Sequence, residues 1–103
     1  MSQMQKMIDE MYCGKTDAVI AGVSSDNEYL VMNAILSGAR HKIRDERFLK
    51  GIDKARTSEV VLLGFPLKSV AEAAYYFLTE KVYVGTDPIV DVLLKNKFDI
   101  ENM

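Results

Sequence analysis

The spacing of apolar residues along the chain predicts a series of helices. Near the start, Met4, Met7, Ile8 and Met11 recur at the three- and four-residue intervals of one helix face. Gly14 follows this stripe as a stop signal. The first predicted helix is therefore short and apolar along one side.

A longer helix is predicted from about Asp26 to about Ile43. Ser25 and Glu28 have the spacing of a capping box at its start. Another helix is predicted for residues 45–56. The inward face of the longer helix is expected to consist of Leu30, Val31, Ala34, Ile35, Gly38 and Ala39.

Two further helices are predicted in the C-terminal half. Pro66 suits the first turn of a helix, and Gly85 is expected to end that helix. Asp87 and Pro88 provide a cap and a first helical residue for the last helix, which runs to about Asn96. The expected inward residues are Val70, Ala71, Ala74, Phe77, Leu78 and Val82 in the first of these helices, and Ile89, Val90, Leu93, Leu94 and Phe98 in the second.

Two short apolar segments, residues 17–23 and 59–65, precede the two long helices. The apolar pattern leaves open whether each is a helix or a strand. Residues 17–36 can be laid over residues 59–78 without a gap at an offset of 42 residues, so that Gly22 matches Gly64. A period of about 40–47 residues is typical of helical-hairpin repeats. The chain is therefore interpreted as an internal repeat, residues 17–43 and 59–84.

The second copy of this repeat resembles a HEAT-like repeat, because Val70, Ala74 and Leu78 follow the spacing of its second helix. The first copy departs from the pattern at Gly38, where a leucine is expected. The resemblance implies an all-α domain over residues 1–103, with about six helices arranged as two hairpins between N- and C-terminal capping helices. Two repeats are fewer than the three that usually make a stable stack, so the end helices act as caps or two chains pair as a homodimer.

The alternative is a small α/β fold. Residues 18–23, 60–65 and 81–84 are β-prone and could form a small parallel sheet. Ala18 and Ala21 favour a helix in the first of these segments.

The charge of the 103-residue chain is unevenly distributed, although its net value is only −2. Residues 40–56 hold seven bases and three acids, for a net charge of +4, and the segments on either side each have a net charge of −3. The basic segment suggests a nucleic-acid-associated regulator as an alternative function. Asp45, Glu46 and Asp53 are interleaved with these bases, so nucleic acid is not the expected partner.

Residues suited to catalysis or metal binding are few. Cys13 and His41 are the sole cysteine and histidine, and the chain has no phosphate-binding glycine loop. We therefore expect no enzyme activity, no cofactor and no metal site. The single thiol suits a reducing compartment, and no apolar run approaches the roughly 20 residues of a membrane span. These features predict a cytoplasmic protein without a membrane partner.

Two polar stripes along the long helices are the candidate binding surface. Exposed tyrosines are favoured anchors in protein interfaces, and the second helices of stacked pairs often line the binding face. The stripes consist of Asn33, Ser37, Arg40 and Arg44 in the first copy, and of Glu72, Tyr76, Thr79 and Tyr83 in the second. Small HEAT-like proteins resemble some bacterial immunity proteins, so the expected function is to bind and block a toxin domain. The acidic ends of the chain would suit a basic, nuclease-like partner.

Overall fold

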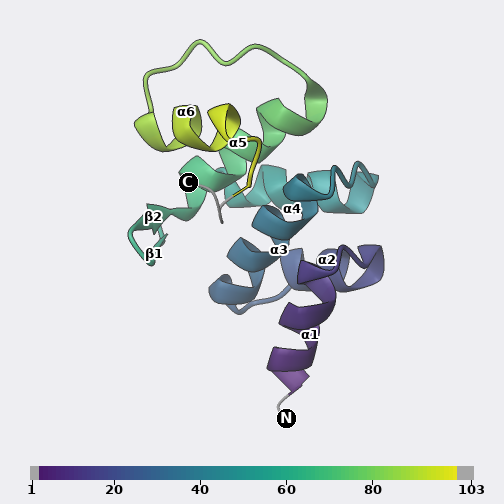
Figure 1. Cartoon of the computed structure of the whole chain (residues 1–103). Coiled ribbons are helices and arrows are strands. Elements are labelled where there is room, and N and C mark those ends of the chain that lie inside the picture. The colour runs from purple at the N-terminus through teal and green to yellow at the C-terminus, as the bar shows by residue number, and fades with distance from the viewer. Residues whose placement is uncertain (1–2, 100–103) are drawn as a thin grey trace.

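The computed structural model describes residues 3–99, which form six helices and one short β-hairpin (Figure 1). The predicted all-α fold class is therefore confirmed. In chain order the elements are α1 (Gln3–Tyr12), α2 (Thr16–Val23), α3 (Glu28–Arg40), α4 (Glu46–Ala55), β1 (Val61–Leu62), β2 (Phe65–Pro66), α5 (Leu67–Thr79) and α6 (Pro88–Lys95).

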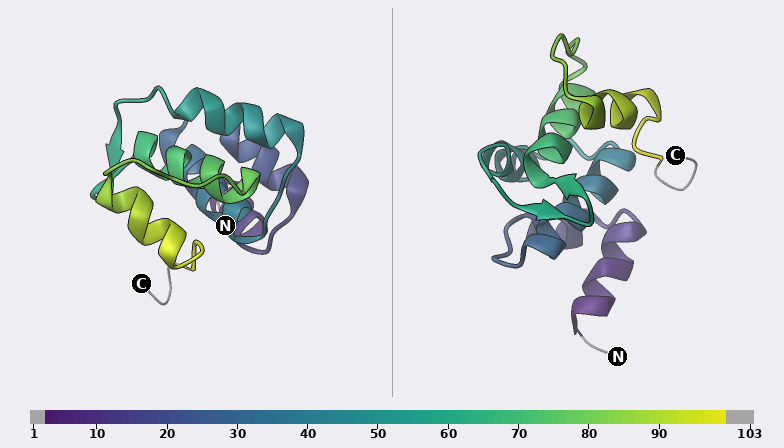
Figure 2. Two further views of the ribbon diagram at one scale, coloured as in Figure 1. Left: turned by 90° about the horizontal axis from the view of Figure 1, so that it is seen from above. Right: turned by 90° about the vertical axis from the view of Figure 1, so that its left-hand side faces the viewer.

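The molecule is elongated and measures 41 × 27 × 24 Å along its principal axes. α1 lies at one end, and α6 lies at the other together with the segment that precedes it (Figures 1 and 2). α3 packs against α1, α2 and α5, and α5 packs against α4 and α6. A surface at the α6 end is therefore built mainly from α5, α6 and their connection.

All six helices contribute to one hydrophobic core. The inward stripe predicted for the longer helix is confirmed, because all six of its residues are buried in α3. Phe48 and Ile52 of α4 are completely buried beside it. In α1, Met11 is buried and Met7 is half-buried, whereas the side chain of Met4 lies outside the described part of the structure.

Gly38 allows three helices to approach closely. A Cβ atom at this position would lie 2.6 Å from Cε2 of Phe48 and 2.8 Å from Cγ1 of Val19. Both of these side chains are fully buried. The glycine that departs from the HEAT-like spacing is therefore required by the packing of α2, α3 and α4.

We predict that Gly38→Ala lowers the free energy of unfolding by about 1–3 kcal/mol, because overpacking a core exceeds the helix-propensity gain of about 1 kcal/mol. Urea denaturation measures this change. Ser37→Ala on the same helix is the control and should change the value by less than about 0.5 kcal/mol. A Gly38→Ala protein as stable as wild type would contradict the packing described for this position.

The segment 59–65 contains strands, whereas the segment 17–23 is helical and forms α2. β1 and β2 pair in antiparallel orientation. Leu63 and Gly64 between them have φ values of 54° and 83°, and a two-residue type I′ turn needs positive φ at both positions. The two copies of the repeat thus share a long helix but differ in the segment before it. The register places Val61 opposite Pro66 and Leu62 opposite Phe65.

The alternative of a small parallel sheet is wrong for the described residues. Residues 18–23 lie within α2, and residues 81–84 have no regular secondary structure. The one hairpin present is antiparallel.

The start of α3 differs from the predicted capping box. Oδ1 of Asn27 accepts hydrogen bonds from the backbone N–H groups of Tyr29 (3.0 Å) and Leu30 (3.4 Å). The Ser25 hydroxyl instead accepts a hydrogen bond from the N–H of Asn27 at 3.0 Å. Asparagine caps as well as serine does, so the helix begins at Glu28, next to its apolar stripe.

The end of α5 also differs, because a residue other than glycine takes a left-handed conformation. Glu80 has φ 58°, and the N–H of Lys81 donates back to the carbonyl of Tyr76 at 3.2 Å. This 6→1 hydrogen bond between backbone groups is typical of a Schellman motif. α5 therefore ends well before Gly85, and α3 also ends early, with Lys42 at φ 56°.

We predict that Glu80→Gly raises the free energy of unfolding by about 1 kcal/mol, because glycine adopts this conformation without a Cβ clash. A gain of that size shifts Tm by roughly 4 °C in a domain of this length. Glu80→Ala is the matched control, since it removes the same carboxylate and keeps the Cβ. Equal thermal stability of the Gly and Ala variants would contradict the left-handed end of α5.

Candidate functional site

The segment that joins α5 to α6, residues 80–87, is drawn out as an arch at the end of the molecule (Figure 1). We call it the connecting segment. Val82 and Val84 are 82% and 88% exposed, whereas Tyr83 between them is half-buried. The prediction that Val82 faces the core is therefore wrong. Two apolar side chains project into solvent, and the tyrosine between them holds the segment to the protein.

Tyr83 packs in a ladder of three tyrosine rings. Its ring meets that of Tyr76 edge-on, with centroids 5.2 Å apart, and Tyr76 meets Tyr75 in the same way at 5.4 Å. The Tyr83 hydroxyl accepts a hydrogen bond from the N–H of Asp87 at 3.0 Å. A Cβ atom at Gly85 would lie 2.8 Å from Cε1 of Tyr83, so this glycine leaves room for the ring.

Asp87 anchors the other end of the connecting segment. Its Oδ1 accepts a hydrogen bond from the N–H of Ile89 at 2.9 Å, and Pro88 occupies the first turn of α6. The predicted start of the last helix is therefore confirmed. Oδ2 of Asp87 accepts a hydrogen bond from the hydroxyl of Ser69, which is buried in α5. The cap thus also fixes α6 to α5.

Arg56 joins α4 to the same region through Glu72. The guanidinium donates two hydrogen bonds to the Glu72 carboxylate, at 2.9 and 3.3 Å, and a third to Asp53 at 3.1 Å. The hydrogen bond to Glu72 raises the pKa of Arg56 above its ordinary value. The guanidinium also lies over the ring of Tyr75, 4.2 Å from its centroid. The Glu72 carboxylate is therefore bound by Arg56, and it holds that guanidinium against the tyrosine ladder.

Lys81 fixes the start of the connecting segment. Its ammonium group donates a hydrogen bond of 2.8 Å to the Tyr75 hydroxyl and lies 5.1 Å from the centroid of that ring. This hydrogen bond raises the pKa of Lys81. Lys81 and Arg56 thus both contact the ring of Tyr75.

A hollow of about 490 Å³ lies between α5 and the connecting segment. We call it the tyrosine hollow, because Tyr76 and Tyr83 both line it. The exposed Val84 stands at its edge, so the hollow and an exposed apolar side chain form one continuous surface. The lining residues are Lys68, Ser69, Glu72, Tyr76, Tyr83, Val84, Gly85, Thr86 and Asp87.

The second predicted stripe is largely brought together here. Glu72, Tyr76 and Tyr83 all line the tyrosine hollow. Thr79 lies elsewhere, because its hydroxyl donates to the Tyr75 carbonyl at 2.6 Å and it lines a different hollow of about 180 Å³.

The first predicted stripe is occupied by contacts close to α3. Asn33 donates a hydrogen bond to the carbonyl of Tyr29 at 2.8 Å. The Arg40 guanidinium lies over the ring of Tyr12, 4.6 Å from its centroid, and Ser37 is half-buried. These residues do not line the tyrosine hollow.

Arg44 connects the first stripe with the end of α5. Its Nε donates a hydrogen bond to the carbonyl of Leu78 at 2.9 Å, and its guanidinium pairs with Glu80 at 3.6 Å. A C-terminal helix carbonyl lacks a partner within its own helix, and Arg44 supplies one. Arg44 therefore stabilises the point at which the chain leaves α5.

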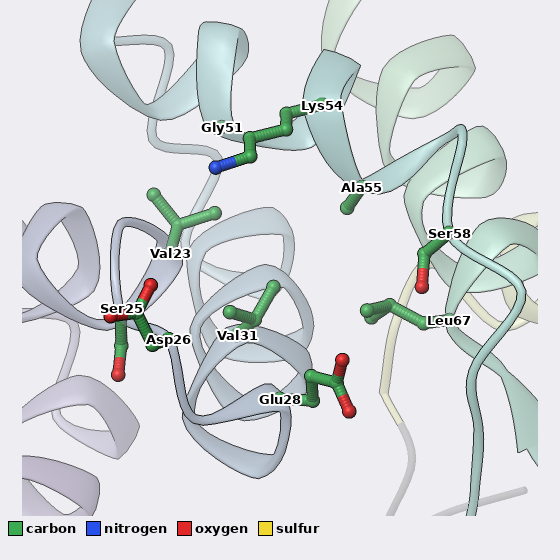
Figure 3. Close-up of a pocket in the computed structure, with 10 residues that line it drawn as sticks. All are labelled: Val23, Ser25, Asp26, Glu28, Val31, Gly51, Lys54, Ala55, Ser58 and Leu67. Carbon is green, nitrogen blue, oxygen red and sulfur yellow. The ribbon is translucent and has the colours of Figure 1, made fainter.

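A second hollow, of about 210 Å³, lies between the α2–α3 turn, α4 and the start of α5 (Figure 3). Lys54 and Glu28 lie on opposite sides of it. None of the eight predicted site residues lines it. The lining residues are Val23, Ser25, Asp26, Glu28, Val31, Gly51, Lys54, Ala55, Ser58 and Leu67.

The basic segment is extensively neutralised within the protein. At least four of its seven cations pair with carboxylates, and the hydrogen bond from Arg47 lowers the pKa of Asp45. Phosphate binding depends on cations that are free to displace counterions. Glu72 and Glu80 lie outside the segment and pair with two of its cations, so it offers less than its net charge of +4 suggests. The pairs are Arg44–Glu80, Arg47–Asp45, Lys50–Glu46 and Arg56–Glu72.

His41 has a packing role near the end of α1. Its Nε2 lies 2.9 Å from the carbonyl oxygen of Tyr12, and a Cβ atom at Gly14 would lie 2.7 Å from its ring. Cys13 is exposed nearby in the chain.

Among the described residues, no group of three His, Cys, Asp or Glu side chains is placed to hold a metal ion. Of the helices between residues 3 and 99, none has both the length and the apolar character that a membrane span requires.

Comparisons with protein-family models, with curated proteins and with solved structures find no match for the chain.

The exposure of Val82 and Val84 is not predicted by the helical pattern, which continues the helix through Val82. The β-prone alternation of Lys81, Val82, Tyr83 and Val84 was the available signal. In the structure Val82 and Val84 are exposed and Tyr83 between them is half-buried, without a sheet.

We predict that Glu72→Gln lowers the free energy of unfolding by about 1–2 kcal/mol, because hydrogen bonds between charged groups are worth more than neutral ones. Both partners are about one-quarter exposed, with side-chain values of 27% for Arg56 and 26% for Glu72. Glu46→Gln is the control, because its pair with Lys50 is exposed and should contribute less than about 0.5 kcal/mol. Equal losses in urea denaturation would contradict a special role for the Arg56–Glu72 pair.

Proposed function

We propose that the chain is a protein-binding module that acts without catalysis, and that its binding surface is the tyrosine hollow together with the connecting segment. The observation that carries this proposal is the exposure of Val82 and Val84, at 82% and 88%, beside a hollow lined by tyrosine rings. Exposed apolar side chains next to a concave surface are typical of sites that bind another protein.

The order of the surface also supports this proposal. Tyr83 is held by ring contacts and a hydrogen bond at its hydroxyl, and both ends of the segment are anchored by Lys81 and Asp87. A surface that is ordered before binding loses less conformational entropy when a partner docks.

In its most concrete form, we propose an immunity protein that binds and blocks a basic, nuclease-like bacterial toxin domain in the cytoplasm. The support is electrostatic, because residues 57–103, which include this surface, have four bases and seven acids. The ion pairs of the basic segment favour this proposal over the nucleic-acid alternative.

The test is a pull-down from extract of the native cell with wild-type protein and two variants. Val82→Asp places a charge on the proposed surface, and Leu63→Asp places the same charge on the hairpin turn, where Leu63 is 79% exposed. We predict that wild type and Leu63→Asp retain a common partner that Val82→Asp loses by about tenfold or more. The proposed surface would be refuted if the pull-down finds no protein that binds Leu63→Asp and is lost with Val82→Asp.

Co-expression of the retained partner then tests the immunity form of the proposal. Wild-type chain and Leu63→Asp should restore growth to cells that express the partner, and Val82→Asp should not. A partner that is harmless when expressed alone would refute the immunity form while leaving the binding surface intact.

A further inference from the structure

The second hollow, between the α2–α3 turn, α4 and the start of α5, shares no lining residue with the tyrosine hollow. We call it the valine hollow, because Val23 and Val31 both line it. These two side chains, with those of Ala55 and Leu67, are between 3% and 8% exposed and form its apolar part. Its volume is about 210 Å³, and an apolar cavity of about 150 Å³ holds a benzene molecule. The valine hollow therefore has room for one large apolar side chain.

The walls of the valine hollow are fixed by contacts within the protein. A Cβ atom at Gly51 would lie 2.6 and 2.7 Å from the two γ carbons of Val23, so this glycine allows α4 to approach α2 closely. The hydroxyls of Ser25 and Ser58 each accept a hydrogen bond from a backbone N–H, at 3.0 and 3.2 Å. A hollow that is formed before binding loses less conformational entropy when a ligand enters it.

Three charged side chains at the valine hollow are free to bind a ligand. Asp26 and Glu28 come from the α2–α3 turn and the first turn of α3, and Lys54 comes from α4. All three are exposed, and within residues 3–99 their charged groups form no hydrogen bond or ion pair. Lys54 and Glu28 lie on opposite sides of the hollow (Figure 3). The apolar centre thus has unpaired negative charge on one side and unpaired positive charge on another.

We propose that the valine hollow binds a segment of a partner protein in which one large apolar side chain stands between a basic and an acidic residue. The apolar side chain enters the hollow, the basic residue faces Asp26 and Glu28, and the acidic residue faces Lys54. Alternate side chains of an extended segment share one face. The recognised pattern is therefore base–x–apolar–x–acid, in either direction along the chain.

Charge complementarity selects this occupant over others. A segment with two basic residues would bring one of them against Lys54, and a segment with two acidic residues would bring one against Asp26 and Glu28. An apolar centre ringed by polar groups is also the usual arrangement around an interface anchor. The proposal does not rest on the tyrosine hollow, because the two hollows have no residue in common.

A nuclear magnetic resonance titration of the methyl-labelled chain with the peptide acetyl-Lys-Ala-Leu-Ala-Glu-amide tests the proposal. We expect saturable shifts of the Val23, Val31 and Leu67 methyl signals with a Kd of about 1 mM, because one side chain supplies most of the contact. Replacing the peptide's leucine by alanine should weaken binding by about tenfold or more. No saturable shift of these signals at peptide concentrations up to about 10 mM would overturn the proposal.

Two further peptides, with Lys or Glu at both charged positions, test the charge pattern. Each should bind wild type about two- to fivefold more weakly than the mixed peptide, as expected for one exposed ion pair. The titrations are made at about 0.15 M salt, which screens charges more than roughly 8 Å apart and so suppresses the effect of overall charge. Equal binding of the mixed peptide and of both uniform peptides would overturn the proposal.

Lys54→Glu should reverse the preference, so that the peptide with two lysines binds about two- to fivefold more tightly than the mixed peptide. Lys95→Glu on α6 makes the same charge change at an exposed residue outside the hollow, and it should keep the wild-type order. Lys54 is exposed and its ammonium group is unpaired within residues 3–99, so the circular dichroism should not change. A Lys54→Glu chain that keeps the wild-type order would overturn the proposal.

Two controls separate this proposal from the alternatives. Shifts of the same methyl signals when the chain is concentrated without peptide would identify a second copy as the occupant and overturn the proposal. Val82→Asp, which tests the tyrosine hollow, should bind the mixed peptide as wild type does. The two binding surfaces can therefore fail independently.

Discussion

The left-handed conformation of Glu80 is the constraint on which the exposed end of the molecule depends. It ends α5 at Thr79 and sends the chain into the connecting segment. Arg44 stabilises this exit by binding the Leu78 carbonyl and pairing with Glu80. If α5 continued instead, Val82 and Tyr83 would lie on a helix surface and the tyrosine hollow would not form.

The tyrosine ladder compensates for two apolar side chains that are left in water. Burial of a valine is worth about 1.5–3 kcal/mol, and Val82 and Val84 forgo most of that contribution. Tyr83 packs against Tyr76 in their place and holds the segment through its hydroxyl. An ordered segment with exposed apolar side chains is stabilised when a partner protein covers those side chains.

Local signals in the sequence predicted much of this structure, and tertiary contacts account for what they missed. The apolar periodicity of α3 and the Asp87–Pro88 start of α6 depend on neighbouring residues alone, so both were correctly predicted. The stop at Glu80 carries no glycine and depends on Arg44, 36 positions earlier in the chain. Tyr76 and Tyr83 were predicted as site residues from their spacing on one helix, yet they meet because the helix ends between them.

A nuclear Overhauser spectrum of the uniformly labelled chain tests the central claim most directly. The account predicts cross-peaks between the ring protons of Tyr76 and Tyr83 and between the Tyr83 ring and the α protons of Gly85. It also predicts that the methyl groups of Val82 show no cross-peaks to the core. Core contacts from the Val82 methyl groups, together with helical N–H to N–H cross-peaks that continue from Thr79 to Val84, would contradict it.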